Sequence, residues 1–184
     1  MTFTNNQEIR RILVVVDMQN DFIDGSLGTG EAVAIVPEVV RKIRAFDGDA
    51  VFATLDMHFE DYLTTHEGKK LPVLHCIDGT EGAKLQPQVL DALRDKNCRM
   101  IPKINSFGTF EIGKELAELF PGGQLEIEII GLCTDICVVT NALLLRTQYP
   151  DAIITVDSHC CAGVTPERHE AALDVMRSCQ IEVI

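Results

Sequence analysis

Apolar runs alternate along this chain with amphipathic stretches of helical periodicity. Six runs are short and continuous, which is typical of strands in a parallel sheet buried on both faces. The predicted strands are Ile12–Asp17, Ala50–Asp56, Arg99–Lys103, Leu125–Gly131, Ala152–Asp157 and Ile181–Ile184. The predicted helices are Ala34–Phe46, Pro87–Asp95, Thr109–Phe120, Asp135–Thr147 and Pro166–Ser178. This alternation predicts an α/β fold with a doubly wound, mainly parallel six-stranded sheet flanked by helices.

Residues 59–86 form one long polar segment that lacks a clear period. A loop of that length in a compact domain is usually functional. The start of the last predicted helix is well defined, because Thr165 followed by Pro166 is typical of a helix N-terminus. The chain of 184 residues contains no internal repeat and no linker, so we expect a single domain over residues 1–184.

Composition narrows the classes of function. Sixteen Lys and Arg against 28 Asp and Glu give a net charge of −12, which opposes binding to nucleic acid or to an anionic membrane. No apolar run approaches the roughly 20 residues of a membrane-spanning helix, and the polar start lacks the apolar core of a signal peptide. We therefore expect a cytoplasmic protein whose seven cysteines are mostly free thiols. A homo-oligomer stays open.

Chemically reactive side chains follow four of the predicted strands. Asp17 ends the first and Asp56 ends the second, with His58 just beyond it. Lys103 ends the third, and Cys137 lies just beyond the fourth. The carboxyl ends of parallel strands share one edge, and ligands bind in the crevice outside that edge. The sequence therefore predicts that these side chains converge on one site.

Cys137 is the leading candidate nucleophile. It lies in the expected first turn of a helix, where backbone N–H groups and the helix dipole lower the pKa of a thiol and can stabilise an oxyanion. Asp17 could take the thiol proton, and Lys103 could hold the thiolate and tune the pKa of Asp17. The alternatives are a small core cysteine, a carboxylate that caps a turn and a solvated lysine.

Asp56 and His58 share one side of an extended segment, since side chains two residues apart point the same way. His75 follows across the polar segment, where His66 and Glu67 could add further ligands. Two imidazoles and a carboxylate with open positions suit a divalent ion of iron, manganese or zinc. The alternative is a set of loop histidines that bind no metal.

Several segments together resemble the isochorismatase-like cysteine hydrolases, and in particular their nicotinamidase branch. The resemblance runs through nearly the whole chain in the family's order. The matching segments are Asp17–Phe22 with Gly25–Leu27, Leu55–His58, Thr65–Cys76 with Gly79–Gly82, Lys103 with Ser106–Gly108, and Gly131–Val138.

The resemblance implies a catalytic triad of Asp17, Lys103 and Cys137. It also implies a cis peptide between Leu132 and Cys133, with an oxyanion hole formed by the backbone N–H groups of Cys133 and Cys137. The implied activity is hydrolysis of nicotinamide to nicotinate and ammonia through a cysteine thioester.

The resemblance further implies a metal held by Asp56, His58 and His75, with Glu67 nearby. In that branch the metal anchors the pyridine nitrogen. Two other functions stay open: hydrolysis of a different small amide, and a non-hydrolytic thiol-redox or ligand-binding role. The redox alternative lacks the C-x-x-C spacing, since Cys133 and Cys137 are four residues apart.

One departure from the family concerns the aromatic side chain beside the substrate ring, because nicotinamidases often place a Trp there. This chain contains no Trp. Phe22 and Phe107 could supply aromatic contacts instead. Ala83 is also smaller than expected at its position in the motif.

Overall fold

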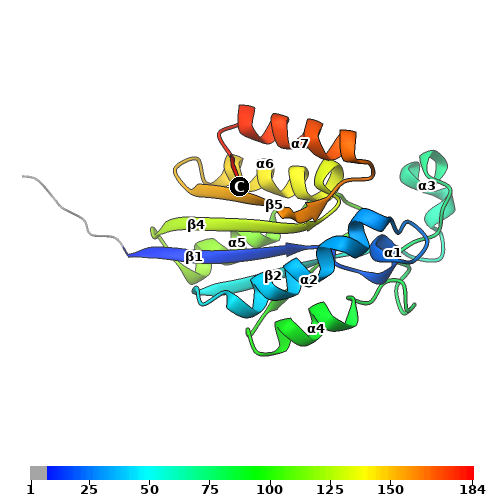
Figure 1. Cartoon of the computed structure of the whole chain (residues 1–184), viewed down its shortest axis with the longest axis horizontal. Helices are drawn as coiled ribbons and strands as arrows, with labels where there is room; N and C mark the ends of the chain where they lie inside the picture. The colour runs from blue at the N-terminus through cyan, green and yellow to red at the C-terminus, as the bar shows by residue number, and fades with distance from the viewer. Residues whose placement is uncertain (1–7) are drawn as a thin grey trace, which may run out of the picture.

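The computed structural model describes residues 8–184, and its centre is a six-stranded parallel sheet (Figure 1). The strand order is β3-β2-β1-β4-β5-β6, and each neighbouring pair runs parallel. The strands are β1 (Ile9–Val16), β2 (Ala50–Met57), β3 (Arg99–Ile104), β4 (Gln124–Leu132), β5 (Ile153–Ala162) and β6 (Glu182–Val183). The predicted fold class is therefore confirmed.

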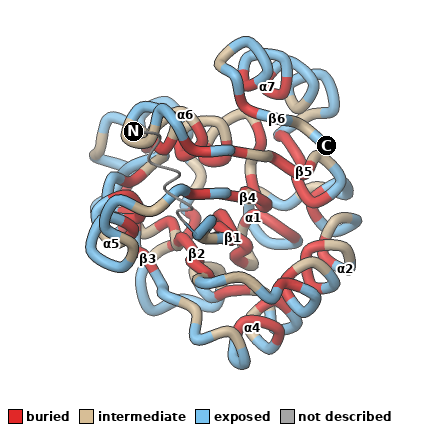
Figure 2. Tube along the Cα trace, turned by 90° about the vertical axis from the view of Figure 1, so that its left-hand side faces the viewer, coloured by how far each residue is buried: buried red, intermediate tan, exposed pale blue. Residues whose placement is uncertain are grey.

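Helices cover both faces of the sheet, with α2 and α4 on one side and α5 and α6 on the other (Figure 2). The longer helices are α2 (Gly30–Ala45), α4 (Pro87–Arg94), α5 (Glu111–Leu119), α6 (Val139–Gln148) and α7 (Pro166–Ser178). The short elements are α1 (Asn20–Ile23), a 3₁₀ turn (Tyr62–Thr64), α3 (His66–Lys70) and a π-helical turn (Thr134–Val138).

Strand β1 shows why its sequence reads as one continuous apolar run. Leu13 and Val15 pack into the core under α2 and α4, whereas Ile12, Val14 and Val16 pack into the core under α5, α6 and α7. Both faces of the strand are buried, so every position has to be apolar. The chain crosses from one side of β1 to the other between β3 and β4, so the switch point where such sheets bind ligands lies between β1 and β4.

The structure corrects several predicted boundaries. The helix predicted from Ala34 begins at Gly30, because Thr29 caps it by accepting a hydrogen bond from the Ala32 N–H. Strand β5 continues past Asp157 to Ala162 across an irregularity in its pairing with β4. The helix predicted over Asp135–Thr147 divides into the π-helical turn and α6.

The polar segment of residues 59–86 is mostly irregular, and it holds the 3₁₀ turn and α3. In Figure 1 α3 extends from the end of the sheet at which β1 points. Among residues 8–184, no helix is long and apolar enough to cross a membrane.

Candidate active site

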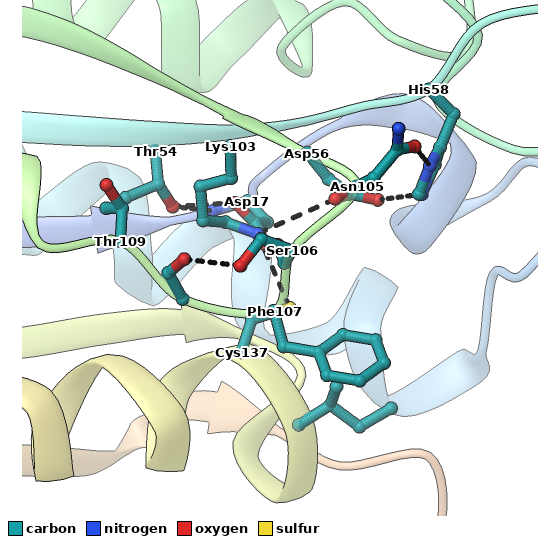
Figure 3. Close-up of polar contacts among 12 residues, drawn as sticks. Asp17, Thr54, Asp56, His58, Lys103, Asn105, Ser106, Phe107, Thr109 and Cys137 are labelled. Carbon is teal, nitrogen blue, oxygen red and sulfur yellow. Dashed lines mark hydrogen bonds and ion pairs between the residues drawn. The ribbon is translucent and has the colours of Figure 1, made fainter. Parts of the chain in front are cut away.

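The carboxyl ends of four neighbouring strands bring the predicted residues together. Asp17 follows β1, Asp56 lies near the end of β2, Lys103 lies near the end of β3, and Cys137 lies in the π-helical turn after β4 (Figure 3). All four side chains are buried. The sheet topology therefore brings residues that are distant in the sequence together, and they form one buried polar cluster at the carboxyl edge of the sheet.

Lys103 connects the members of this cluster. Its Nζ lies 2.8 Å from Asp17 Oδ2 and 3.6 Å from Asp56 Oδ1, and it lies 3.7 Å from Cys137 Sγ. Burial by itself lowers the pKa of Lys103, but the carboxylates of Asp17 and Asp56 and the neighbouring Cys137 together raise it above the ordinary value. Lys103 is therefore a fixed cation between a carboxylate and a thiol.

Asp17 is held on both of its carboxylate oxygens. Thr54 donates its hydroxyl to Asp17 Oδ1 at 2.6 Å, and Lys103 lies beside Oδ2. The backbone at Asp17 has φ +47°, a left-handed conformation that is uncommon for a residue other than glycine. Burial raises the pKa of Asp17, and Lys103 opposes this rise. A carboxylate with a raised pKa is suited to accept and return a proton.

Cys137 is buried, and the pKa of its thiol is raised, whereas a lowered value was predicted from the sequence. Burial and the nearby Asp17 raise the pKa of the thiol well above its ordinary value, and Lys103 lowers it only in part. Desolvation of a thiolate beside a carboxylate outweighs the helix-terminus effect. In this structure the thiol is therefore the stable form, and attack requires an adjacent proton acceptor.

The turn that carries Cys137 is stabilised by its own backbone and by Asn141. The structure has the cis peptide between Leu132 and Cys133, and the Cys133 carbonyl accepts hydrogen bonds from the N–H groups of Ile136 and Val138. Asn141 donates to the Cys137 carbonyl at 2.8 Å. Burial raises the pKa of the Cys133 thiol to about 12, as it raises that of Cys137, so the pKa values do not separate the two thiols. The contact that separates them is that of Cys137 Sγ with Lys103 Nζ.

Asp56, His58 and His75 form a second cluster next to the first. One ligand atom from each lies within 4.8 Å of the others, and all three residues are buried. His58 Nε2 lies 3.0 Å from Asp56 Oδ2, and His75 Nε2 lies 3.6 Å from the same oxygen. Burial raises the pKa of Asp56, but the close contact with His58 and the charge of Lys103 lower it overall.

The hydrogen bonds of the two histidines fit a metal site. The second ring nitrogen of His75 lies 2.8 Å from the Val73 carbonyl, which can only accept, so this Nδ1 carries the proton and Nε2 keeps its lone pair. In His58 the Nδ1 faces Asn105 Oδ1 at 2.9 Å, and the buried Nε2 has no hydrogen-bond partner. Two imidazole lone pairs and a carboxylate oxygen face one another, which is the donor set of a divalent metal.

Glu67 and His66 differ in their relation to this cluster. Glu67 Oε1 lies 3.9 Å from His58 Nε2 and 3.8 Å from His75 Nε2. His66 is exposed and lines the neighbouring cavity, and it is not a member of the three-residue cluster. Glu67 is therefore the nearer of the two candidate ligands.

One cavity of about 830 Å³ joins both clusters, since Cys137 lines one part of it and Asp56 and His75 line another. Phe22 and Phe107 also line this cavity. Phe22 is buried, and its ring lies 5.6 Å from the His75 ring, whereas Phe107 is half exposed. Ala83 does not line the cavity, so its small size does not shape it.

Four residues that contact the predicted site residues were not predicted from the sequence. Thr54 and Asn105 contact Asp17 and His58 as described. The Gln19 amide bonds both the N–H and the carbonyl of Asp56, and the Tyr62 ring lies 4.6 Å from the His58 ring. Gln19 and Asn105 each follow a candidate residue by two positions, and this repeated spacing is the signal that could have found them.

Comparison with known proteins places this geometry in a family. The family model of the isochorismatase domain matches residues 11–184. The chain therefore belongs to the isochorismatase family.

Within that family the similar proteins carry related names. A nicotinamidase from Schizosaccharomyces pombe is 31% identical over 207 residues, which covers 94% of this chain and 91% of that protein. A crystal structure of a nicotinamidase/pyrazinamidase from Bacillus subtilis has a TM-score of 0.80 at 29% identity, covering 95% of this chain and 98% of that one. A pyrazinamidase from Pyrococcus horikoshii in complex with zinc has a TM-score of 0.78 at 28% identity, with the same coverage.

Proposed function

We propose that this protein is a nicotinamidase that hydrolyses nicotinamide to nicotinate and ammonia through a thioester on Cys137. One observation supports this most strongly. Lys103 lies between the Asp17 carboxylate and the Cys137 thiol, on a cavity that the Asp56–His58–His75 cluster also lines. A nucleophile, a proton acceptor and a site for a ring nitrogen are what this reaction needs.

In the proposed first half-reaction, Asp17 takes the proton of the Cys137 thiol as sulfur attacks the carboxamide carbon. The backbone N–H groups of Cys133 and Cys137 are the proposed donors to the oxyanion. Asp17 then returns its proton to the leaving nitrogen, so the C–N bond breaks and ammonia departs. Lys103 stabilises the anionic form of each partner in turn.

In the second half-reaction, Asp17 accepts a proton from water as the water oxygen attacks the thioester carbon. The C–S bond breaks, and the proton on Asp17 returns to Cys137. The product leaves as the carboxylic acid, whose remaining proton passes to ammonia or water to give nicotinate. The two half-reactions together consume one water and release one ammonia. No redox partner is required, which separates this proposal from a thiol-redox function.

Asp56, His58 and His75 would hold a divalent metal ion, with Glu67 as a neighbouring carboxylate. When bound, such an ion supplies a Lewis acid that can anchor a pyridine nitrogen. Phe22, beside His75, and Phe107, near Cys137, would contact the two sides of the ring. Because the chain has no Trp, ring position would depend more on the nitrogen than on stacking.

A panel of small amides tests this function. We expect ammonia release from nicotinamide and pyrazinamide, and a lower kcat/KM for benzamide, which keeps the ring and the amide but lacks the ring nitrogen. Equal kcat/KM for nicotinamide and benzamide would remove the nitrogen-anchoring part of the proposal. Ammonia release only from non-pyridine amides would favour the alternative of a different small amide.

We also infer a cytoplasmic location, because all seven cysteines are free thiols, as expected in a reducing compartment. The single domain over residues 1–184 stays a prediction, and the oligomeric state stays open.

A further inference from the structure

The catalytic cavity is larger than nicotinamide requires. Its volume of about 830 Å³ lies within the range of roughly 300–1,000 Å³ that is typical of sites for drug-sized ligands. Nicotinamide is one six-membered ring with one carboxamide. A substrate anchored at Cys137 and at the Asp56–His58–His75 cluster would therefore leave much of the cavity to a ring substituent.

Two cations line this cavity, Lys70 from the end of α3 and Arg168 from the first turn of α7. Both residues are exposed, so their side chains lie where the cavity opens to solvent, which is called the mouth below. Within the described part of the chain, neither forms an ion pair or a side-chain hydrogen bond. These two cations therefore keep their charge free for an anionic ligand, although the protein as a whole has a net charge of −12.

Most other basic residues of the chain have a polar partner for their side chain, in contrast to Lys70 and Arg168. Of the 16 Lys and Arg, all lie within residues 8–184, and only Lys69, Lys70 and Arg168 lack both an ion pair and a side-chain hydrogen bond there. Two of these three line the cavity, and Lys69 does not. Lys96 and Arg146 also lack an ion pair, but they donate hydrogen bonds to backbone carbonyls. Among the described residues, two of the three cations without any polar side-chain partner therefore line the entrance to the Cys137 thiol.

Glu67 could have neutralised Lys70, since residues three apart on a helix are neighbours. It does not form that pair. Its carboxylate lies 3.8 Å from His75 Nε2 and 3.9 Å from His58 Nε2, on the side of the metal cluster. The acidic side chains of the cavity, Asp56 and Glu67, thus belong to the inner cluster, and the mouth keeps its positive charge.

We propose that Lys70 and Arg168 form an anion-selecting mouth, so that the enzyme also hydrolyses pyridine carboxamides that carry a carboxylate on the ring. This inference rests on the proposed function, because it places the amide at Cys137. The reaction is the same: one water is consumed, the amide C–N bond breaks, and ammonia leaves. The added carboxylate stays unchanged and lies near the two cations.

The test compares ring isomers of carboxynicotinamide with the matching nitronicotinamides. A nitro group has the planar shape of a carboxylate without its charge. For each pair, kcat/KM for ammonia release is measured in the wild type and in the double variant Lys70→Gln and Arg168→Gln. The intrinsic reactivity of each compound is the same for every variant, so the change in the carboxy-to-nitro ratio reports the contribution of the mouth.

We expect the ratio for at least one isomer to fall by about three- to tenfold in the double variant, which is the size of two exposed ion pairs. Lys69→Gln is the matched control and should leave the ratio unchanged. Added salt should lower the ratio in the wild type and much less in the double variant. Circular dichroism checks that each variant is folded.

A ratio that stays within about twofold for every isomer, or a wild type that hydrolyses no carboxylated isomer, would overturn the anion-selecting mouth. Nicotinamide itself reports separately on the proposed function. Ammonia from carboxylated isomers but none from nicotinamide would overturn the nicotinamidase proposal and support the mouth. Ammonia from nicotinamide, together with a carboxy-to-nitro ratio that is unchanged in the double variant, would support the nicotinamidase proposal and overturn the anion-selecting mouth.

Discussion

At the scale of single residues, Lys103 determines the electrostatics of the site. It is buried, and it lies closer to Asp17 than to Cys137, with distances of 2.8 Å and 3.7 Å. The sequence predicted that these residues would meet. It did not predict that the Cys137 thiol has a raised pKa, because the degree of enclosure depends on side chains from several elements.

The pH dependence of kcat/KM tests the proposed roles of Asp17 and Lys103. Burial raises the pKa of Asp17, so we expect the acidic limb of the profile to lie above the ordinary Asp range near about 4. Lys103 lowers that pKa, so Lys103→Met should move the limb to still higher pH, and activity should fall. Lys114→Met, at an exposed residue paired with Glu111, is the control. An acidic limb at the same pH in Lys103→Met would contradict the coupling.

Metal affinity tests the hydrogen bonds around the second cluster. Asn105 fixes the ring of His58 through Nδ1, so Asn105→Ala should weaken binding of zinc by about 10- to 100-fold. His58→Ala should abolish tight binding, whereas His159→Ala, at an exposed histidine, should leave it unchanged. Zinc titration followed by calorimetry gives the Kd of each variant. Wild-type affinity in His58→Ala would show that the cluster is not the metal site.

At the scale of elements, the end of β4 positions the nucleophile. Gly131 has φ +120°, and a Cβ built there would lie 2.1 Å from the Val16 carbonyl oxygen of β1. Only glycine allows β4 to pass this close to the strand that carries Asp17. The approach of the two strands thus brings the Cys137 turn toward Asp17.

A stability measurement tests this close approach. Gly131→Ala should lower the free energy of unfolding in urea by at least about 2 kcal/mol, because the clash is with backbone and cannot relax cheaply. Gly30→Ala, at a helix position where an added Cβ meets nothing, should be neutral or slightly stabilising. Equal stability of the two variants would contradict a required glycine at residue 131.

Some helices and strands could be predicted from the sequence, and others could not. Continuous apolar runs such as β1 were predicted because burial on both faces removes alternation. The first turn of α2 was missed, since Gly30 is a poor helix former and the apolar period begins later. The π-helical turn at Thr134–Val138 follows an ordinary helical pattern, so nothing in the sequence distinguished it from the start of α6.

At the scale of the whole molecule, strand order explains why distant residues share one site. The strands that lead to Lys103, Asp56, Asp17 and Cys137 are β3, β2, β1 and β4, which are consecutive in the sheet. Parallel pairing made their common edge predictable from the sequence. The partners that hold the site, such as Thr54, depend on the register between β1 and β2, which the sequence alone does not define.

The central claim is that Cys137 is the nucleophile of nicotinamide hydrolysis, and ammonia release by Cys137→Ala tests it most directly. Loss of a nucleophile should lower kcat by about 10⁴-fold or more, while removal of one small thiol should leave the protein folded. Cys133→Ala is the matched control and should keep substantial activity, because only its backbone N–H is proposed to act. Activity of Cys137→Ala within about tenfold of the wild type would contradict the thioester mechanism.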